Sequence, residues 1–158
     1  MKHIVITGST RGIGFALAQA FLKLDCAVMV SGRTPEAVDE AVARLSDNAP
    51  AGRISGFACD VQAIAQVQAL WQAAVSRFDH VDTWINNAGL SGPPAPAWQQ
   101  SPEAARQVVQ TNLLGSMYGA IVAVQGMLSQ GYGALYNMEG MGSDGRKHAG
   151  LAYYGTTK

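Results

Sequence analysis

Tyr154 and Lys158 lie four residues apart in a stretch whose pattern predicts a helix, so their side chains share one helix face. A phenol with a pKa of about 10 is a weak acid–base group at pH 7, but a neighbouring ammonium favours the phenolate. Such a pair can donate a proton to a carbonyl oxygen or take one from an alcohol. The neighbouring Tyr153 is expected to pack against the protein. The spacing is common in proteins, so its meaning depends on the elements that surround it.

A glycine-rich turn near the start of the chain is the second candidate site. Residues 4–6 predict a buried strand, and a helix follows with Ile13, Leu17, Ala20, Phe21 and Leu24 on its expected buried stripe. Between strand and helix, the spacing of Gly8, Gly12 and Gly14 would permit a tight turn and the close approach of a pyrophosphate to the helix N-terminus. The spacing differs from both Gly-x-Gly-x-x-Gly and the P-loop. A tight connection without a ligand is therefore the alternative interpretation.

Further strands and helices alternate along the chain. Strands are predicted at residues 27–31, 54–59, 81–85 and 133–137, and helices at residues 35–45, 63–78, 102–129 and from 152 onward. This alternation predicts an α/β fold, a doubly wound parallel sheet of the Rossmann type in three layers, with strand order 3-2-1-4-5. Residues 1–158 are expected to form a single dinucleotide-binding domain.

Distinctive polar residues follow the predicted strands directly. They are Thr7, Arg33, Asp60, Asn86 and Asn87. Open α/β sheets bind ligands at the carboxyl ends of their strands, so these side chains are candidates for a ligand site. Asn and Asp are also favoured in turns, so capping of the strand ends is the alternative for Asn86 and Asn87.

Five segments in order identify a family resemblance. They are TGSTRGIG at 7–14, Asp60-Val61, NNAG at 86–89, Asn112, and YGTTK at 154–158. The chain resembles the classical short-chain dehydrogenases/reductases over its whole length. The resemblance implies a nicotinamide cofactor with its pyrophosphate at the glycine turn, its adenine beside Asp60 and Val61, and its adenine ribose above Asn87–Gly89. The implied cofactor-binding residues are Gly8, Thr10, Arg11, Gly12, Ile13, Gly14, Arg33, Asp60, Val61, Asn87, Ala88, Gly89, Tyr154 and Lys158.

The resemblance also assigns catalytic roles. Tyr154 would be the acid, Lys158 would tune it and bind the nicotinamide ribose, and Asn112 would relay protons. A buried asparagine bonded to backbone is the alternative for Asn112. The family's carbonyl-polarising serine would be Ser143, because Glu139 and Gly140 occupy the usual serine positions. This loop resembles the chlorophyll b reductase branch of the family, and Glu139 is a further candidate. His148 is expected to be a surface residue.

The residues near the second strand end predict which cofactor is bound. An acidic residue there suits a ribose 2′-hydroxyl, whereas arginine suits a 2′-phosphate. Here the strand ends in Gly32-Arg33 without an acid, and Arg11 lies in the glycine turn. Two guanidinium groups suit a dianionic phosphate, so the cofactor is predicted to be NADP(H). The alternative is that both arginines are ordinary surface residues.

Composition excludes several function classes. The net charge is zero, with 14% charged and 48% hydrophobic residues, which argues against nucleic acid or an anionic membrane as partner. No apolar run is long enough for a membrane span, and no signal or transit peptide is evident, so a cytoplasmic location is expected. Cys26 and Cys59 are predicted to be buried thiols, and no metal site is expected.

These patterns together predict an NADPH-dependent carbonyl reductase of the short-chain type, acting on a small-molecule carbonyl or alcohol, with a chlorophyll b-like formyl group as a candidate substrate. A 3-oxoacyl reductase and a non-catalytic NADP-binding regulatory protein are the alternatives. The chain ends on Lys158, so the C-terminal strands and substrate loop of the family are expected to be absent. A homodimer or homotetramer is expected of a full-length protein.

Overall fold

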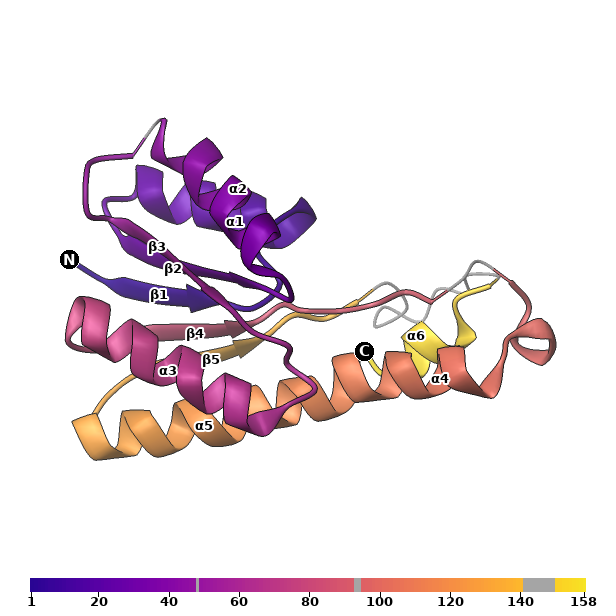
Figure 1. Cartoon of the computed structure of the whole chain (residues 1–158). Helices are drawn as coiled ribbons and strands as arrows, with labels where there is room; N and C mark the ends of the chain where they lie inside the picture. Colours follow the sequence, from indigo (N-terminus) through magenta and orange to yellow (C-terminus); the bar gives the residue numbers. More distant parts are fainter. Residues whose placement is uncertain (48, 93–94, 141–149) are drawn as a thin grey trace.

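A five-stranded parallel sheet forms the centre of the fold, with the strands in the order β3-β2-β1-β4-β5. The computed structural model describes residues 1–47, 49–92, 95–140 and 150–158 (Figure 1). The strands are β1 (His3–Ile6), β2 (Ala27–Gly32), β3 (Ile54–Ala58), β4 (Thr83–Asn86) and β5 (Ala134–Asn137). The predicted α/β class and strand order are confirmed.

Helices cover both faces of the sheet in three layers (Figure 1). On one face lie α1 (Gly12–Lys23) and α2 (Pro35–Ser46), and on the other α3 (Ile64–Phe78) and α5 (Gly115–Gln130). Strand β1 shows why both faces are apolar. Ile4 and Ile6 pack into the core under α1 and α2, whereas Val5 packs into the core under α3 and α5. Alternate side chains of a parallel strand thus enter two separate cores.

Side-chain caps begin two of the helices. Thr34 accepts a hydrogen bond from the Ala37 backbone N–H, and Pro35 occupies the first helical position of α2. Ser101 does the same for α4 (Pro102–Val108), in which Pro102 is the first residue. Both helices therefore start at a hydroxyl cap followed by proline. The hydroxyl accepts a hydrogen bond from one of the free backbone N–H groups of the first turn, and the proline has no backbone N–H that needs a partner.

The buried face of α1 differs from the predicted stripe. Ile13 and Leu24 are 66% and 71% exposed, and Ala20 is exposed as well, whereas the buried residues are Gly14, Ala18 and Leu22. The reason is the close approach of this helix to the sheet, which only small side chains at its first turns permit. Ile13 is directed instead toward the carboxyl ends of the strands, where it lines a cleft.

The long helix predicted at 102–129 has three parts. After α4, the π-helical segment η2 (Val109–Leu114) leads into α5, and the three run on as one rod in Figure 1. A short 3₁₀ turn, η1 (Ala97–Gln99), precedes this rod, and α6 (Ala152–Thr156) contacts α4. A π-helical insertion changes the direction of the side chains that follow it, and such insertions are frequent at functional sites. In the part of the chain that the structure describes, no helix combines the length and apolarity needed to cross a membrane.

Candidate functional site

A cleft of about 610 Å³ opens at the carboxyl ends of the strands. It lies on the side of the sheet where the glycine turn, the ends of β2 to β5 and helix α6 meet. All of the residues proposed from the sequence as cofactor-binding line this cleft: Gly8, Thr10, Arg11, Gly12, Ile13, Gly14, Arg33, Asp60, Val61, Asn87, Ala88, Gly89, Tyr154 and Lys158. The fold therefore brings together residues from the two ends of the chain in one cavity.

The glycine turn is held in place by the segment that follows β4. The Asn87 side-chain amide donates to the carbonyl oxygens of Thr7 and Gly8, both at 2.9 Å. In return, the Thr7 hydroxyl accepts from the backbone N–H groups of Asn87 and Ala88, at 3.0 and 3.1 Å. These four bonds fix the turn relative to β4, so Asn87 both lines the cleft and supports its floor.

Two glycines of the turn have no room for a side chain. A Cβ on Gly14 would collide with the Asn87 amide and lie 2.6 Å from the Gly8 carbonyl oxygen. Gly8 has φ of +63°, and a Cβ there would lie 2.7 Å from the Ala88 Cα. The backbone of the turn is thus open toward the cleft and closely packed behind it, which fits the cradle that a pyrophosphate requires.

Ser9 is a supporting residue that lies within the motif at residues 7–14 but to which that motif assigns no role. It is fully buried; its hydroxyl donates to the Ile6 carbonyl at 2.7 Å and accepts from the Ser31 N–H at 2.9 Å. The turn is thereby fastened to the end of β2 as well as to β4. Nothing in the local sequence marks this contact, because Ser31 lies 22 positions away.

Asn86, by contrast, acts within the sheet. Its side chain is buried, accepts from the Trp84 indole at 2.8 Å, and donates to the Ser116 carbonyl and the Asn137 amide oxygen. It therefore joins β4 to β5 and α5. The strand-capping interpretation fits Asn86, whereas Asn87 combines support with a place in the cleft.

Asp60 follows β3 at the far side of the cleft. Its backbone N–H donates to the Gln66 side chain, and one of its carboxylate oxygens accepts from the Gln62 N–H at 3.0 Å. Behind it lies the buried Cys59, whose thiol pKa is raised to about 12 by burial first and by the charge of Asp60 second. Cys59 is therefore a protonated, unreactive part of the wall at neutral pH.

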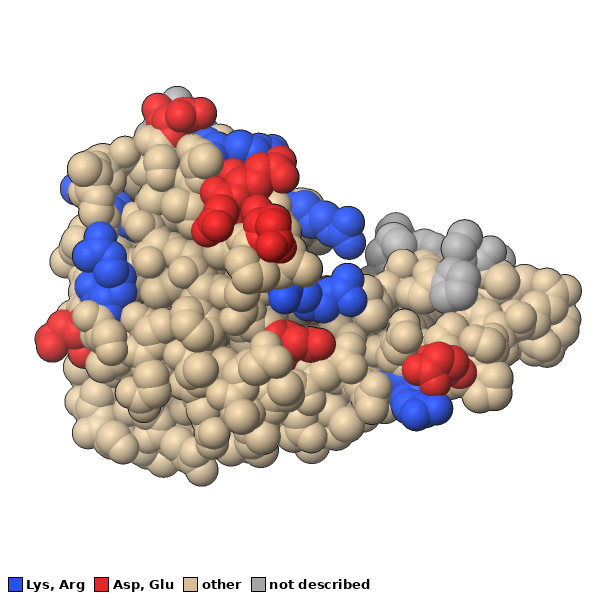
Figure 2. All heavy atoms as spheres, in the orientation of Figure 1, with Lys and Arg blue, Asp and Glu red and all other residues tan. Residues whose placement is uncertain are grey.

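Arg11 and Arg33 lie on the rim of the cleft, and both are exposed. Neither forms an ion pair with an acidic residue among those the structure describes. Figure 2 shows basic side chains beside the hollow that separates the sheet from the α4–α6 region. Two guanidinium groups without a partner in this part of the molecule leave the rim positively charged.

Tyr154 and Lys158 reach the cleft from α6 and the residues that follow it. The Lys158 ammonium donates to the Met138 carbonyl at 3.2 Å, and burial lowers the pKa of this group. A Cβ on Gly140 would lie 2.6 Å from the Tyr154 hydroxyl and 2.7 Å from Lys158 Cβ. The segment after β5 therefore packs directly against both side chains, and only a glycine fits there. The neighbouring Tyr153 donates to the Ala97 carbonyl instead and serves packing.

Asn112 lies in the π-helical segment and bridges two loops of the site. Its side-chain oxygen accepts from the Leu90 N–H at 2.7 Å, and its amide donates to the Leu90 carbonyl and to Thr157 Oγ1, both at 2.9 Å. The Thr157 hydroxyl in turn donates to the Tyr154 carbonyl. The Asn112 side-chain amide therefore donates only to protein groups. Thr157, which connects Asn112 to Tyr154, is a second supporting residue to which the sequence assigned no role.

Of the two residues expected to polarise the carbonyl, the structure describes Glu139 but not Ser143. Glu139 is exposed and lines the cleft. Ser143 and His148 lie outside the described residues.

The short chain dehydrogenase profile matches residues 2–158. The chain belongs to this family. The chain is 39% identical to the chloroplastic chlorophyll(ide) b reductase NOL of Oryza sativa subsp. japonica over 158 residues, covering 99% of this chain and 46% of that protein. The chain thus spans less than half the length of this curated relative.

Solved structures agree with this placement in the short-chain dehydrogenase family. An actinorhodin polyketide ketoreductase with NADPH matches with a TM-score of 0.89 and 30% identity, over 99% of this chain and 59% of that one. NAD⁺-bound xylitol dehydrogenase matches with a TM-score of 0.90 and 25% identity, over 99% of this chain and 59% of that one. The family therefore includes proteins with each of the two nicotinamide cofactors.

The cytoplasmic location predicted from the sequence is wrong. The chlorophyll(ide) b reductases of Oryza sativa and Arabidopsis thaliana to which the chain is similar are chloroplastic proteins. The prediction rested on the lack of an evident membrane span, signal peptide or transit peptide. Such absences carry no information on location when the chain matches only part of its relatives.

Proposed function

We propose that this oxidoreductase is an NADPH-dependent carbonyl reductase that acts on a formyl group of a chlorophyll b-like compound. The observation that carries the proposal is the position of Tyr154 and Lys158 in the same cleft as the glycine turn. The loop after β5 and the chlorophyll(ide) b reductase relatives support the choice of substrate. A substrate carbonyl near Tyr154 would lie beside the segment that contains Glu139.

The proposed reaction converts an aldehyde to a primary alcohol. When bound, the nicotinamide supplies a hydride to the carbonyl carbon. Tyr154 donates its phenol proton to the carbonyl oxygen, so the C=O double bond becomes a C–O single bond with a new C–H bond and a new O–H bond, and solvent then returns a proton to Tyr154. Lys158, when protonated, would favour the phenolate form of Tyr154. Asn112 positions the α6 segment through Thr157. A direct role of Asn112 as proton relay stays a prediction.

The test of this function is NADPH oxidation, followed through the absorbance of the reduced nicotinamide, with two classes of carbonyl substrate. A formyl-bearing chlorin should be reduced to its hydroxymethyl product with a higher kcat/KM than a short 3-oxoacyl thioester. The reverse preference would favour the 3-oxoacyl reductase. Tight NADPH binding without turnover of either compound would favour a regulatory nucleotide-binding protein.

Arg33 should select NADPH over NADH. A hydrogen bond to a charged group contributes roughly 1.5–3 kcal/mol, so Arg33→Ser should weaken NADPH binding by about 10- to 100-fold. NADH binding should change less than about threefold, because NADH lacks the 2′-phosphate. Fluorescence titration with both cofactors measures the difference.

Arg106→Ser is the matched control, since Arg106 is exposed on α4 and pairs with Glu103 outside the cleft. It should leave both affinities unchanged. Equal weakening of NADPH and NADH in Arg33→Ser would show that Arg33 supports the turn without reading the phosphate, and would contradict the NADP assignment.

We further propose that the protein is a homo-oligomer in which α5 packs against a second copy. One face of the η2–α5 rod carries five exposed apolar side chains, at spacings of three and four residues: Leu113, Met117, Ile121, Val124 and Leu128. This spacing is typical of a helix face that is buried against another element. Two copies of the same stripe can pack against each other in an isologous contact, in which both subunits use the same surface. Exposed apolar stripes of this kind mark interfaces.

Ile121→Asp should therefore weaken self-association by more than about 10-fold, because it places a charge at the centre of the stripe. Sedimentation velocity at micromolar concentration measures the effect. Gln19→Asp adds the same charge on the exposed face of α1 and serves as control. A wild-type protein that sediments as a monomer would overturn the proposal.

A further inference from the structure

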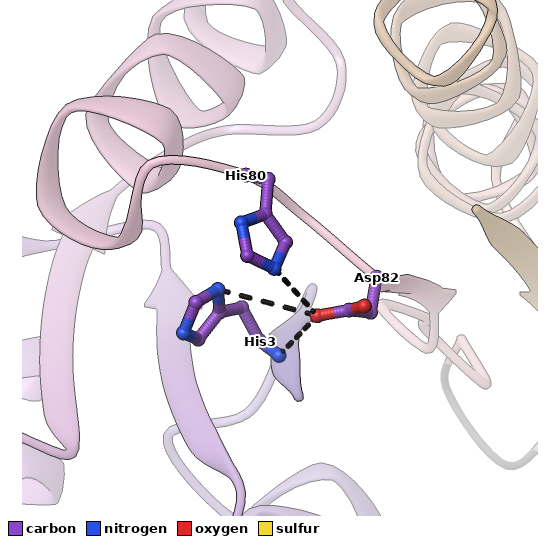
Figure 3. Close-up of side chains that lie close together, drawn as sticks. All are labelled: His3, His80 and Asp82. Carbon is purple, nitrogen blue, oxygen red and sulfur yellow. Dashed lines mark hydrogen bonds and ion pairs between the residues drawn. The ribbon is translucent and has the colours of Figure 1, made fainter. Parts of the chain in front are cut away.

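A second cluster of polar side chains lies at the opposite edge of the sheet from the cleft. It consists of His3, His80 and Asp82 (Figure 3). His3 begins β1, Asp82 immediately precedes β4, and His80 lies in the connection from α3 to β4. None of the three lines the cleft. The sequence alone predicts no metal site, because His3 and Asp82 are 79 positions apart and no spacing motif joins them.

The three side chains converge on one point. The His80 Nε2 lies 3.3 Å from Asp82 Oδ2, and the His3 Nδ1 lies 4.0 Å from the same oxygen. One ligand atom from each residue can be chosen so that all three lie within 4.8 Å of one another. In a tetrahedral zinc site with bonds of about 2.0–2.1 Å, neighbouring ligand atoms are roughly 3.4 Å apart. The His80–Asp82 pair already has about this separation, whereas the His3 Nδ1, at 4.0 Å from Asp82 Oδ2, would have to move closer to become the third ligand.

The buried nitrogen of His3 is the second observation that points to a ligand. His3 is buried, with 11% of its side chain exposed, and its Nδ1 has no hydrogen-bond partner among the described residues. The ring stacks on Phe78 with a centroid distance of 5.2 Å, and its Nδ1 faces the Asp82 carboxylate (Figure 3). A buried polar atom without a partner costs free energy, and a bound cation would satisfy it.

Asp82 is held in position for the same task. Its Oδ2 accepts the His3 backbone N–H at 2.7 Å, which fixes the carboxylate toward the two rings. Burial, followed by the neighbouring His80, lowers the pKa of His3.

We propose that His3 Nδ1, His80 Nε2 and Asp82 Oδ2 bind a Zn²⁺ ion, with water as the fourth ligand. Two imidazole nitrogens favour zinc over magnesium or calcium, which prefer oxygen ligands. The site lies away from the cleft, so the ion has a structural role. It would tie the start of β1 to the α3–β4 connection.

Isothermal titration of chelator-treated, tag-free protein with ZnCl₂ at pH 7.5 tests the proposal. We expect one Zn²⁺ per chain with a Kd in the micromolar range or below. Replacing an outer-shell partner of a metal site typically costs 10- to 100-fold in affinity, so loss of a ligand in His80→Asn or Asp82→Asn should cost more than about 100-fold. His148→Asn, which removes the remaining histidine of the chain, should leave Kd within about threefold.

Thermal unfolding provides a readout that does not depend on heat of binding. Zinc at 100 times Kd should raise Tm by roughly 5–10 °C in the wild type and by less than about 1 °C in His80→Asn. NADPH affinity should stay the same with and without zinc. His80 is partly exposed, so His80→Asn is expected to fold even if Asp82→Asn does not.

Two results would overturn the proposal. The first is the absence of stoichiometric zinc binding to the wild type. The second is unchanged zinc affinity in both His80→Asn and Asp82→Asn, which would place the ion elsewhere. In either case the three residues would form only a hydrogen-bonded cluster at the sheet edge.

Discussion

Tyr154→Phe should lower kcat for carbonyl reduction by about 100- to 10,000-fold while NADPH affinity changes less than about threefold. The phenol hydroxyl is the proton donor in the proposed reaction, and phenylalanine keeps the ring but loses the proton. Steady-state kinetics and NADPH titration on the same preparation separate the two effects.

Tyr153→Phe is the matched control for this experiment. Tyr153 belongs to the same helix, and its hydroxyl donates to the Ala97 carbonyl outside the cleft. We expect at most a change of about threefold in kcat and a small loss of stability, because one hydrogen bond is worth about 1 kcal/mol. A Tyr154→Phe enzyme that keeps a third or more of wild-type kcat would contradict the assignment of Tyr154 as the acid.

Most of the sheet was predictable because its signals are local. Each strand is a short apolar run bounded by turn residues. The strand also determines where the polar residue that follows its carboxyl end lies. The βαβ handedness and the alternation of elements then determine the order β3-β2-β1-β4-β5. The cleft residues follow from the same logic, since parallel strands bring their carboxyl ends to one edge.

Other features depend on contacts between distant segments and leave no local signal. Ser9 reads as one more residue of a glycine turn until Ser31 is placed beside it. Thr157 connects Asn112 to α6 only in the folded chain. The predicted stripe of α1 was wrong at Ile13, Ala20 and Leu24, because hydrophobicity alone does not reveal which face of this helix lies against the sheet.

The same distinction explains the cluster of His3, His80 and Asp82. Each residue taken alone is ordinary, since His3 begins a strand and Asp82 follows a turn. Parallel pairing of β1 with β4 brings the residues before β4 next to the start of β1. A cation site made in this way has no sequence motif, in contrast to the glycine turn, whose three glycines lie within one short segment, residues 8–14.

Gly14→Ala should lower both stability and cofactor affinity. The added Cβ would meet the Asn87 amide and the Gly8 carbonyl oxygen, and it would lie 2.8 Å from the Ser9 Cα. Two of these neighbours are backbone atoms, so the helix or the turn must shift. Overpacking of this kind costs about 1–3 kcal/mol. The loss of hydrogen bonds from Asn87 adds about 1 kcal/mol each, and the gain of alanine over glycine in a helix offsets up to about 1 kcal/mol.

We therefore expect Tm to fall by roughly 4–16 °C and the Kd for NADPH to rise by more than about 10-fold. Calorimetry and fluorescence titration measure the two quantities. Gly155→Ala is the control, because a Cβ on Gly155 in α6 would meet no atom within 4 Å. That variant should be as stable as the wild type or up to about 1 kcal/mol more stable.

The two readouts of Gly14→Ala distinguish between two roles of the glycine. If NADPH affinity falls while Tm is unchanged, the turn moves away from the cofactor at no cost to the fold, and Asn87 does not hold it as tightly as its bonds to Thr7 and Gly8 indicate. If both quantities stay at wild-type values, the close approach of α1 to β4 is not required, and Gly14 has no steric role in the turn. A fall in both would show that the position of the cofactor and the stability of the sheet depend on the same contact.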